Sequence, residues 1–158
     1  MMKKILCLVL LSQLIISCGF TPIYKNSDIL KNNQLIYYVI DDSISYEAKS
    51  ILNKNLIKTE KEKAKFITKI YVNEKESTVN VLSSGSVSEY RIEVLINFTI
   101  LEVSENKILY KSKSRGSANY DVSTSEYQNT LVKNEALKRA LSEATQLMNI
   151  LIQSKINE

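Results

Sequence analysis

Alternating hydrophobic and polar residues dominate the middle of the chain. The longest stretch is SEYRIEVLINFTILEV, in which every second residue from Tyr90 to Ile100 is apolar. A period of two is typical of a half-buried antiparallel strand. Shorter alternating stretches lie at 65–73 and 107–119, and turn-forming residues separate the stretches at 83–86 and 104–106. The pattern therefore predicts three successive antiparallel strands.

Two stretches with helical spacing lie on either side of these strands. A short apolar run, QLIYYVI at 34–40, predicts a buried strand before the first helix. Asp41-Asp42-Ser43 predicts the cap of that helix, and Ser123 with Glu126 or Ser125 with Gln128 predicts a capping box for the second. The first helix has apolar residues at Ile44, Ala48, Ile51, Leu52 and Leu56, and the second at Leu137, Ala140, Leu141, Ala144, Leu147, Met148, Leu151 and Ile152.

The element order is therefore β-α-β-β-β-α. A sheet with one apolar face and two amphipathic helices is covered most simply when both helices lie on that face. The expected fold is an α+β two-layer sandwich, with a four-stranded, mostly antiparallel sheet. The opposite face of the sheet is expected to be polar and, on its fourth strand, basic through Lys107, Lys111, Lys113 and Arg115. These cations either face solvent or attract an anion.

The first 17 residues have the pattern of a lipoprotein signal peptide. Lys3 and Lys4 form a basic start, and the apolar run from Ile5 to Ile16 is shorter than the roughly 20 residues that span a bilayer. The run ends in Ile15-Ile16-Ser17-Cys18, which resembles a bacterial lipobox. A lipobox implies diacylglycerol attachment at Cys18, cleavage before it and acylation of the new amine. The alternatives are a signal peptide with a coincidental cysteine, or an N-terminal buried helix.

This interpretation divides the chain into three segments: a signal peptide at 1–17, a lipidated tether at 18–33 and a folded domain at 34–158. Cys18 would be the single cysteine of the mature chain, so an internal disulfide is excluded. Diacylglycerol and the acylated amine would give Cys18 three acyl chains. Stable membrane attachment requires two such signals, so this anchor would be sufficient. Inner-membrane lipoproteins usually have aspartate directly after the lipidated cysteine. This chain has Gly19 there, which resembles the sorting signal of an outer-membrane lipoprotein.

Residue content argues against most catalytic and nucleic-acid-binding classes. The chain has no histidine, so imidazole catalysis and histidine metal sites cannot occur, and we expect neither an enzyme nor a metal. No glycine-rich phosphate loop is visible, and the expected cofactor is none beyond the lipid at Cys18. The net charge of +4 is mild, which predicts no nucleic-acid partner.

Four stretches of the sequence resemble the LPS-assembly lipoproteins, the LptE family. CGFTPIY resembles the start of the mature family members, and SVSEYRIEVLINFTILE resembles their long central strand. SANYDVSTSEY resembles the segment before their last helix, and LVKNEALKRALSEATQLMNILI resembles that helix. In element order the resemblance covers essentially the whole mature chain. The fold that it implies, two helices on a four-stranded sheet, is the one expected from the periodicity.

The resemblance implies a function in binding rather than in turnover. LptE-like proteins sit as a plug inside a large outer-membrane β-barrel, LptD, help to assemble it and interact with lipopolysaccharide. The implied location is the outer membrane, lipid-anchored, facing the periplasm and inside the barrel lumen. The polar sheet face expected here suits such a lumen.

The resemblance also implies two lipopolysaccharide contacts. Family members use a basic residue near the turn between the third and fourth strands, and Lys107 stands there. They also use a lysine near the start of the last helix, which corresponds to Lys133. At 100° per residue Lys133 projects onto the apolar stripe of Leu137 and Ala140, so it either reaches solvent at the tip of the domain or meets an anion. Lys111, Lys113 and Arg115 would attract lipid A phosphates by charge-assisted bonds.

Two other functions stay open. The first is an auxiliary lipoprotein of an envelope ABC-type lipid transport system, which would depend on an inner-membrane ATPase. The second is an envelope enzyme, which the absence of histidine disfavours. The partner that accompanies the protein distinguishes these possibilities from a barrel plug.

Overall fold

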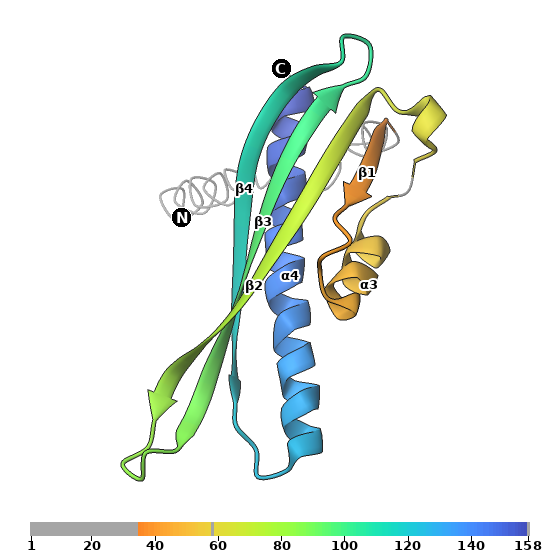
Figure 1. Cartoon of the computed structure of the whole chain (residues 1–158). Helices are drawn as coiled ribbons and strands as arrows, with labels where there is room; N and C mark the ends of the chain where they lie inside the picture. The colour runs from red at the N-terminus through yellow and green to blue at the C-terminus, as the bar shows by residue number, and fades with distance from the viewer. Residues whose placement is uncertain (1–34, 58, 158) are drawn as a thin grey trace, which may run out of the picture.

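The computed structural model describes residues 35–57 and 59–157, which form a single sheet with two helices on one side (Figure 1). The predicted signal peptide, the tether and Cys18 lie outside these residues. The chain order is β1 Ile36–Ile40, α3 Tyr46–Asn55, a 3-10 turn η2 Lys61–Lys63, β2 Phe66–Val81, β3 Val87–Glu102, β4 Lys107–Asp121 and α4 Glu126–Ile156. The predicted fold class and element order are therefore confirmed.

The sheet has the strand order β1-β2-β3-β4. The three long strands pair antiparallel, and the short β1 pairs parallel with β2, so that Ile36 lies beside Phe66. A parallel pair needs a crossover, and α3 provides it. The sheet is thus mixed, with one parallel and two antiparallel pairings.

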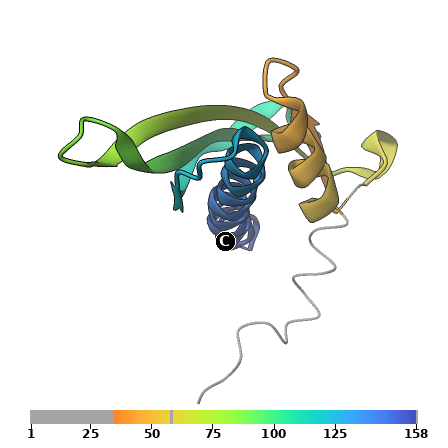
Figure 2. The same cartoon turned by 90° about the horizontal axis from the view of Figure 1, so that it is seen from below.

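Both helices cover the same face of the sheet (Figure 2). The alternation of β3 decides which face: Ile92, Val94, Ile96, Phe98 and Ile100 are all buried beneath the helices. Helix α4 contributes Ala136, Ala140, Leu141, Ala144, Met148 and Ile152 to the same core, and α3 contributes Ala48 and Leu52. None of the helices in the described residues is both long and apolar enough to cross a membrane.

The predicted stripe of α4 is correct except at Leu147. Its side chain is 43% exposed, whereas Leu141 and Met148 are fully buried. Leu147 lies at the margin of a wide stripe, where neither the sheet nor α3 covers it. Ile150, 62% exposed, lies on the same flank of the helix.

The predicted caps are correct only in part: Ser125 is the N-cap of α4, although its side chain makes no capping hydrogen bond. Helix α3 begins later than expected: Ser45 is its N-cap, and the Ser45 hydroxyl accepts from the Ala48 amide at 3.2 Å. Asp41 instead accepts from the Ser43 amide at 2.7 Å, which shapes the preceding turn. Before α4, the Asn129 side chain bonds both main-chain groups of Ser123, at 2.5 and 3.0 Å, in place of a capping box.

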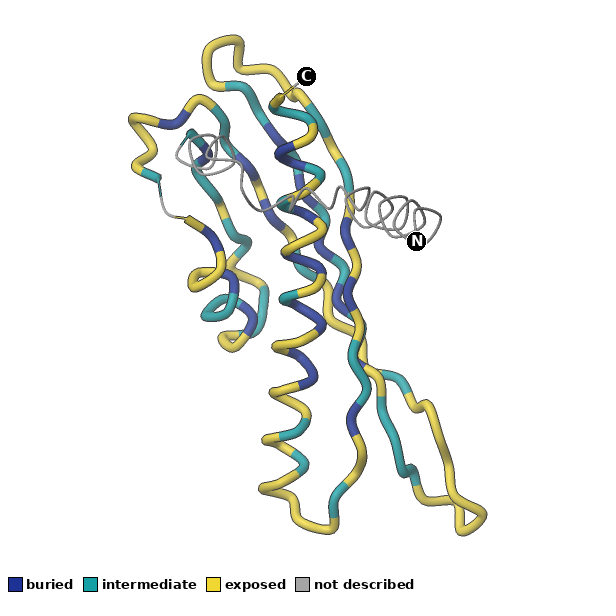
Figure 3. The backbone as a smooth tube through the Cα atoms, turned by 180° about the vertical axis from the view of Figure 1, so that it is seen from behind, coloured by how far each residue is buried: buried dark blue, intermediate teal, exposed yellow. Residues whose placement is uncertain are grey.

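Strands β2 and β3 continue beyond the helices as an exposed hairpin arm (Figure 3). Its turn contains Gly85 with φ of 85°, a left-handed conformation that glycine adopts without strain. A register shift separates Thr78 from Asn80 near this turn. The arm shares little of the core, since residues 78–86 are all exposed.

Candidate functional site

The predicted binding residues lie in two separate regions. Lys107 begins β4 at the β3–β4 turn, whereas Lys133 lies about two turns into α4, near the opposite end of the sheet (Figure 1). The two lysines therefore do not form one compact site in this fold. Lys111, Lys113 and Arg115 lie along β4 between these ends.

Lys133 is part of a cluster that joins α4 to the base of the hairpin arm. Its Nζ lies 2.6 Å from Oε2 of Glu76 on β2. The Tyr120 hydroxyl of β4 donates to the other oxygen of Glu76. The Tyr120 ring stacks on Tyr90 of β3, with ring centroids 5.6 Å apart. Side chains from β2, β4 and α4 thus meet at one carboxylate, and Tyr90 of β3 packs beside them.

This cluster shifts two pKa values in opposite directions. Hydrogen bonds from Lys133 and then from Tyr120 lower the pKa of Glu76, because they stabilise the charged carboxylate. Burial, followed by the hydrogen bond to Glu76, raises the pKa of Tyr120. At neutral pH Glu76 is therefore a carboxylate and Tyr120 a neutral phenol.

A cavity of about 270 Å³ opens beside the Lys133 cluster. Its walls combine aromatic carbon with polar groups: Tyr90, Tyr120, Val122, Glu126, Asn129, Thr130 and Lys133. An anion that bound Lys133 here would compete with Glu76, which already neutralises the ammonium. Lys133 could therefore bind an anion only if its ion pair with Glu76 opened.

Replacing Glu76 with glutamine is expected to remove a pH-dependent part of the stability. The folded pKa of Glu76 is lowered from 4.5, so its stabilising effect is complete above that pH. The effect is lost as pH falls through the folded value. We expect Glu76→Gln to cost about 1 kcal/mol at pH 7, the upper range for a partly exposed ion pair, and less at pH 3.

Thermal unfolding at the two pH values measures this difference. Glu105→Gln is the matched control, because Glu105 lies in the β3–β4 turn and makes no ion pair with any described residue. An equal loss for Glu76→Gln at pH 7 and pH 3 would contradict the ion-pair explanation.

The second region is the open face of the sheet. The strand registers define four successive rows across it, and the first row is entirely apolar, whereas the next three contain four cations. The rows are Tyr37, Ile67, Leu101 and Ile108; Val39, Lys69, Thr99 and Lys111; Tyr71, Asn97 and Lys113; and Asn73, Leu95 and Arg115. No acidic residue lies in these rows, and the first one beyond them is Glu93, beside Lys75.

The predicted placement of Lys107 on this face is wrong. A register shift in the β3–β4 pairing places Tyr110 opposite Ile100 but Ile108 opposite Leu101, so Leu109 is an extra residue. Such a bulge reverses the alternation beyond it. Ile108 therefore lies on the open face, and Lys107, opposite Glu102, belongs to the helix side. Lys111, Lys113 and Arg115 keep their predicted face.

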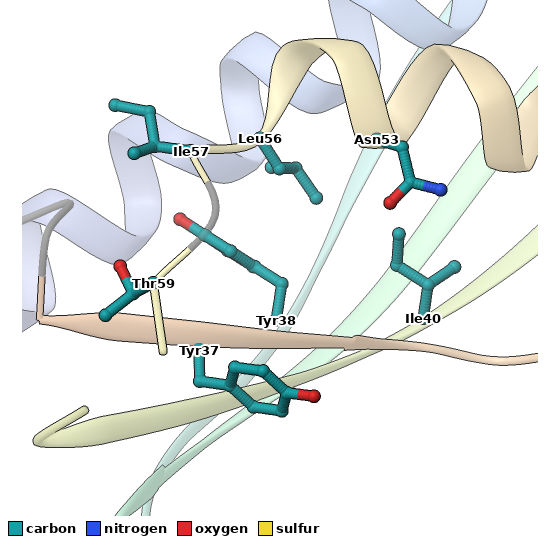
Figure 4. Close-up of a pocket in the computed structure, with 7 residues that line it drawn as sticks. All are labelled: Tyr37, Tyr38, Ile40, Asn53, Leu56, Ile57 and Thr59. Atoms are coloured by element: carbon teal, nitrogen blue, oxygen red, sulfur yellow. The ribbon is translucent and has the colours of Figure 1, made fainter. Parts of the chain in front are cut away.

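A further cavity, also about 270 Å³, lies between β1 and α3 (Figure 4). Tyr38 and Ile40 project toward α3, and Tyr37 projects from the opposite side of β1. Burial raises the pKa of Tyr38 to about 12. Among the described residues, no charged side chain lines this cavity.

Sequence reasoning missed two participants, Glu76 and Lys69. The signal for Glu76 was present, since the period of two that buries Thr68 and Ile70 also places Glu74 and Glu76 on the helix face. Only the strand register shows that Lys69 lies in the same row of the open face as Lys111. Residues 35–57 and 59–157 contain no group of three potential ligands, counting aspartate, glutamate and cysteine, that could hold a metal ion.

Three solved structures that share this fold are named as lipoproteins. A protein of Caulobacter crescentus that is provisionally classed as a lipoprotein superimposes with a TM-score of 0.66 at 15% identity, covering 83% of this chain and 96% of its own. The rare lipoprotein B of Shewanella oneidensis gives 0.53 at 13% identity, covering 77% and 96%. The minor lipoprotein of Acinetobacter baumannii gives 0.55 at 13% identity, covering 75% and 90%. This chain shares their fold.

The likeness is structural only. No protein-family profile matches the sequence, and no curated protein does. At 13–15% identity the shared feature is the arrangement of four strands and two helices, and it does not carry over a ligand or a partner.

Proposed function

We propose that this chain is an outer-membrane lipoprotein, anchored through Cys18, that plugs and helps to assemble an LptD-type β-barrel and binds lipopolysaccharide on its way to the outer leaflet. It acts by binding, without turnover. The shared lipoprotein fold and the resemblance to the LptE family support this class.

The main support for the proposal is the distribution of apolar and basic residues on the open face of the sheet. Lipid A is an amphiphile with acyl chains and phosphates, and this face has an apolar row next to acid-free basic rows. Phosphates form charge-assisted hydrogen bonds with lysine and arginine, and the exposed Ile108 at the end of the apolar row can contact acyl chains. A mostly polar sheet face also suits the wall of a large barrel lumen.

The position of β1 agrees with an anchored N-terminus. The described chain starts at Leu35, directly before β1, and Tyr37 belongs to the apolar row. The tether from Cys18 therefore joins the domain at the end of the sheet where the apolar row lies. The cations of β4 follow at increasing distance from that end.

Co-purification from detergent-extracted outer membranes tests this function. We expect a large β-barrel in a stoichiometric complex, identified by mass spectrometry. The Cys18→Ala variant is the control for the anchor, since it should lose both its acyl label and its place in the outer-membrane fraction. An ATPase-containing assembly would favour the ABC-transporter alternative and contradict the proposal.

Lipopolysaccharide binding should respond in opposite directions to two changes in the Lys133 cluster. Lys133→Ala should weaken binding about fivefold, on the scale of 1 kcal/mol for one exposed charge contact. Glu76→Gln should strengthen binding, because it releases Lys133 from its ion pair.

Lys138→Ala is the matched control for that measurement. It removes the same charge from α4, but Lys138 is exposed and outside the Glu76 cluster. Titration with purified lipopolysaccharide measures all three variants. Equal losses for Lys133→Ala and Lys138→Ala would mean that only net charge matters.

A further inference from the structure

The outer edge of β4 presents a row of main-chain hydrogen-bonding groups. The Val122 amide bonds to Ser88 of β3 at 2.9 Å, so even-numbered residues of β4 pair with β3. The main-chain groups of odd-numbered residues therefore point away from the sheet. No register shift interrupts this alternation between Tyr110 and Asp121.

Side chains of α4 occupy one half of that edge. Glu143 accepts from the Ser117 amide at 2.9 Å, and Arg139 donates to the Asn119 carbonyl at 3.0 Å. These contacts close the edge toward the hairpin arm, as proteins commonly do with exposed strands. They also confirm that odd-numbered residues of β4 face outward.

Within residues 35–57 and 59–157, nothing covers the other half of the edge. Among the described residues, no hydrogen bond reaches the outward main-chain groups of Lys111, Lys113 or Arg115. Three successive outward-facing residues offer three donors and three acceptors. That is enough to pair with an extended segment of about five residues.

The two sides of this open edge differ in chemistry. On the open face of the sheet stand the three cationic side chains of the edge residues themselves. On the helix side stand Leu147 and Ile150, four and seven residues after Glu143 and hence on its flank of α4. They lie roughly 6 and 10 Å beyond Glu143 along the helix, level with the open part of β4.

We propose that the β4 edge from Lys111 to Arg115 binds an extended strand of a partner protein whose side chains alternate between acidic and apolar. The acidic side chains pair with the cations, the apolar ones cover Leu147 and Ile150, and the main chain completes the ladder. A second copy of this chain is disfavoured, because its own cations would face these. This strand site does not depend on lipid binding, although both can use the same cations.

Amide hydrogen exchange of the full chain in detergent micelles tests the edge first. In the free protein, the amides of Lys111, Lys113 and Arg115 should exchange quickly, and those of Ser112, Ser114 and Gly116 slowly. A capped seven-residue peptide that alternates glutamate and valine should slow the first set at least tenfold. Unchanged exchange at saturating peptide would overturn the proposal.

Selective N-methylation of the peptide separates strand addition from simple charge attraction. In antiparallel addition the residues opposite the lysines donate to β4, and their side chains share the face of the lysines. Methylating the glutamate amides should therefore abolish binding, while methylating the valine amides should not. The reverse preference would indicate parallel addition. If both sets or neither matter, the main-chain edge is not the binding site.

A charge reversal completes the test. Lys113→Glu should weaken peptide binding about fivefold, as expected for one exposed charge contact, and Lys138→Glu should not. Binding of a lipid phosphate to the same cations would also be weakened by Lys113→Glu. A lipid has no peptide amides, however, so the effect of N-methylation is specific to strand addition. A wild-type protein that binds the peptide but not lipopolysaccharide would contradict the proposed function and leave the strand site standing.

Discussion

Replacing Gly116 with alanine is expected to destabilise the protein by about 3 kcal/mol, the upper range for overpacking of a core. Glycine within a strand normally weakens it, so at an open site the same change would stabilise. Here an added Cβ would lie 2.0 Å from the carbonyl oxygen of Ala140 and 2.7 Å from the amide nitrogen of Ala144. Both are main-chain atoms, so relief requires a shift of α4 itself.

The reason for this close approach is the small-residue stripe of α4. Ala136, Ala140 and Ala144 are all fully buried against the sheet, which lets the helix axis approach β4 closely. Interiors packed to this density transmit a displacement of the main chain to every neighbour. We therefore expect Gly116→Ala to disturb the whole length of the contact between α4 and β4.

Urea unfolding of Gly116→Ala and Ser114→Ala measures the effect against a matched control. Ser114 lies two residues earlier on the same face of β4, and its buried hydroxyl has no hydrogen-bond partner among the described residues. Removing an unpaired buried hydroxyl is expected to be neutral or stabilising. A Gly116→Ala protein as stable as the wild type would mean that α4 does not lie this close to β4.

Replacing Leu141 with aspartate is expected to cost at least about 4 kcal/mol, as an unpaired charge in a core does. Leu141 is fully buried and belongs to the continuous core between α4 and the sheet. The buried residues of the described chain include no lysine or arginine, so the new carboxylate would have no buried cation as a partner.

Leu147→Asp is the matched control, because it makes the same substitution at an exposed leucine of α4. The two leucines lie on the same helix, and periodicity alone assigns both to the apolar stripe, but Leu147 is 43% exposed. We expect Leu147→Asp to cost less than about 1 kcal/mol, as surface changes do. Similar losses for the two variants in thermal unfolding would contradict the orientation of α4 in the structure.

The fold was predictable because each element carries a strong local pattern. The alternation from Tyr90 to Ile100 identifies β3 and its buried face, and both are confirmed. The buried stripe of Leu137, Ala140, Leu141 and Ala144 identifies α4. The helix caps were not predictable in the same way, because several serine and aspartate residues near each start can cap it, and tertiary contacts such as that of Ser45 with Glu74 choose among them.

The candidate site was predictable only in part. Lys111, Lys113 and Arg115 were correctly assigned to the open face, since they lie beyond the bulge on an uninterrupted alternation. Lys107 was assigned to the wrong face, because one extra residue at Leu109 reverses the sides of the strand. A single sequence contains no clear signal for such a bulge in a run of mixed apolar and basic residues.

The sequence by itself determined the elements, their order and which residues of each are apolar, because periods of 2 and 3.6 are local properties of the chain. Only the tertiary structure decided that Lys133 meets Glu76, that Lys69 joins Lys111, and that Glu143 and Arg139 close one half of the β4 edge. The residues that are brought together in this way lie between 20 and 57 positions apart in the chain. They depend on register and on the approach of α4 to β4, and both are set by packing between elements rather than by any one of them.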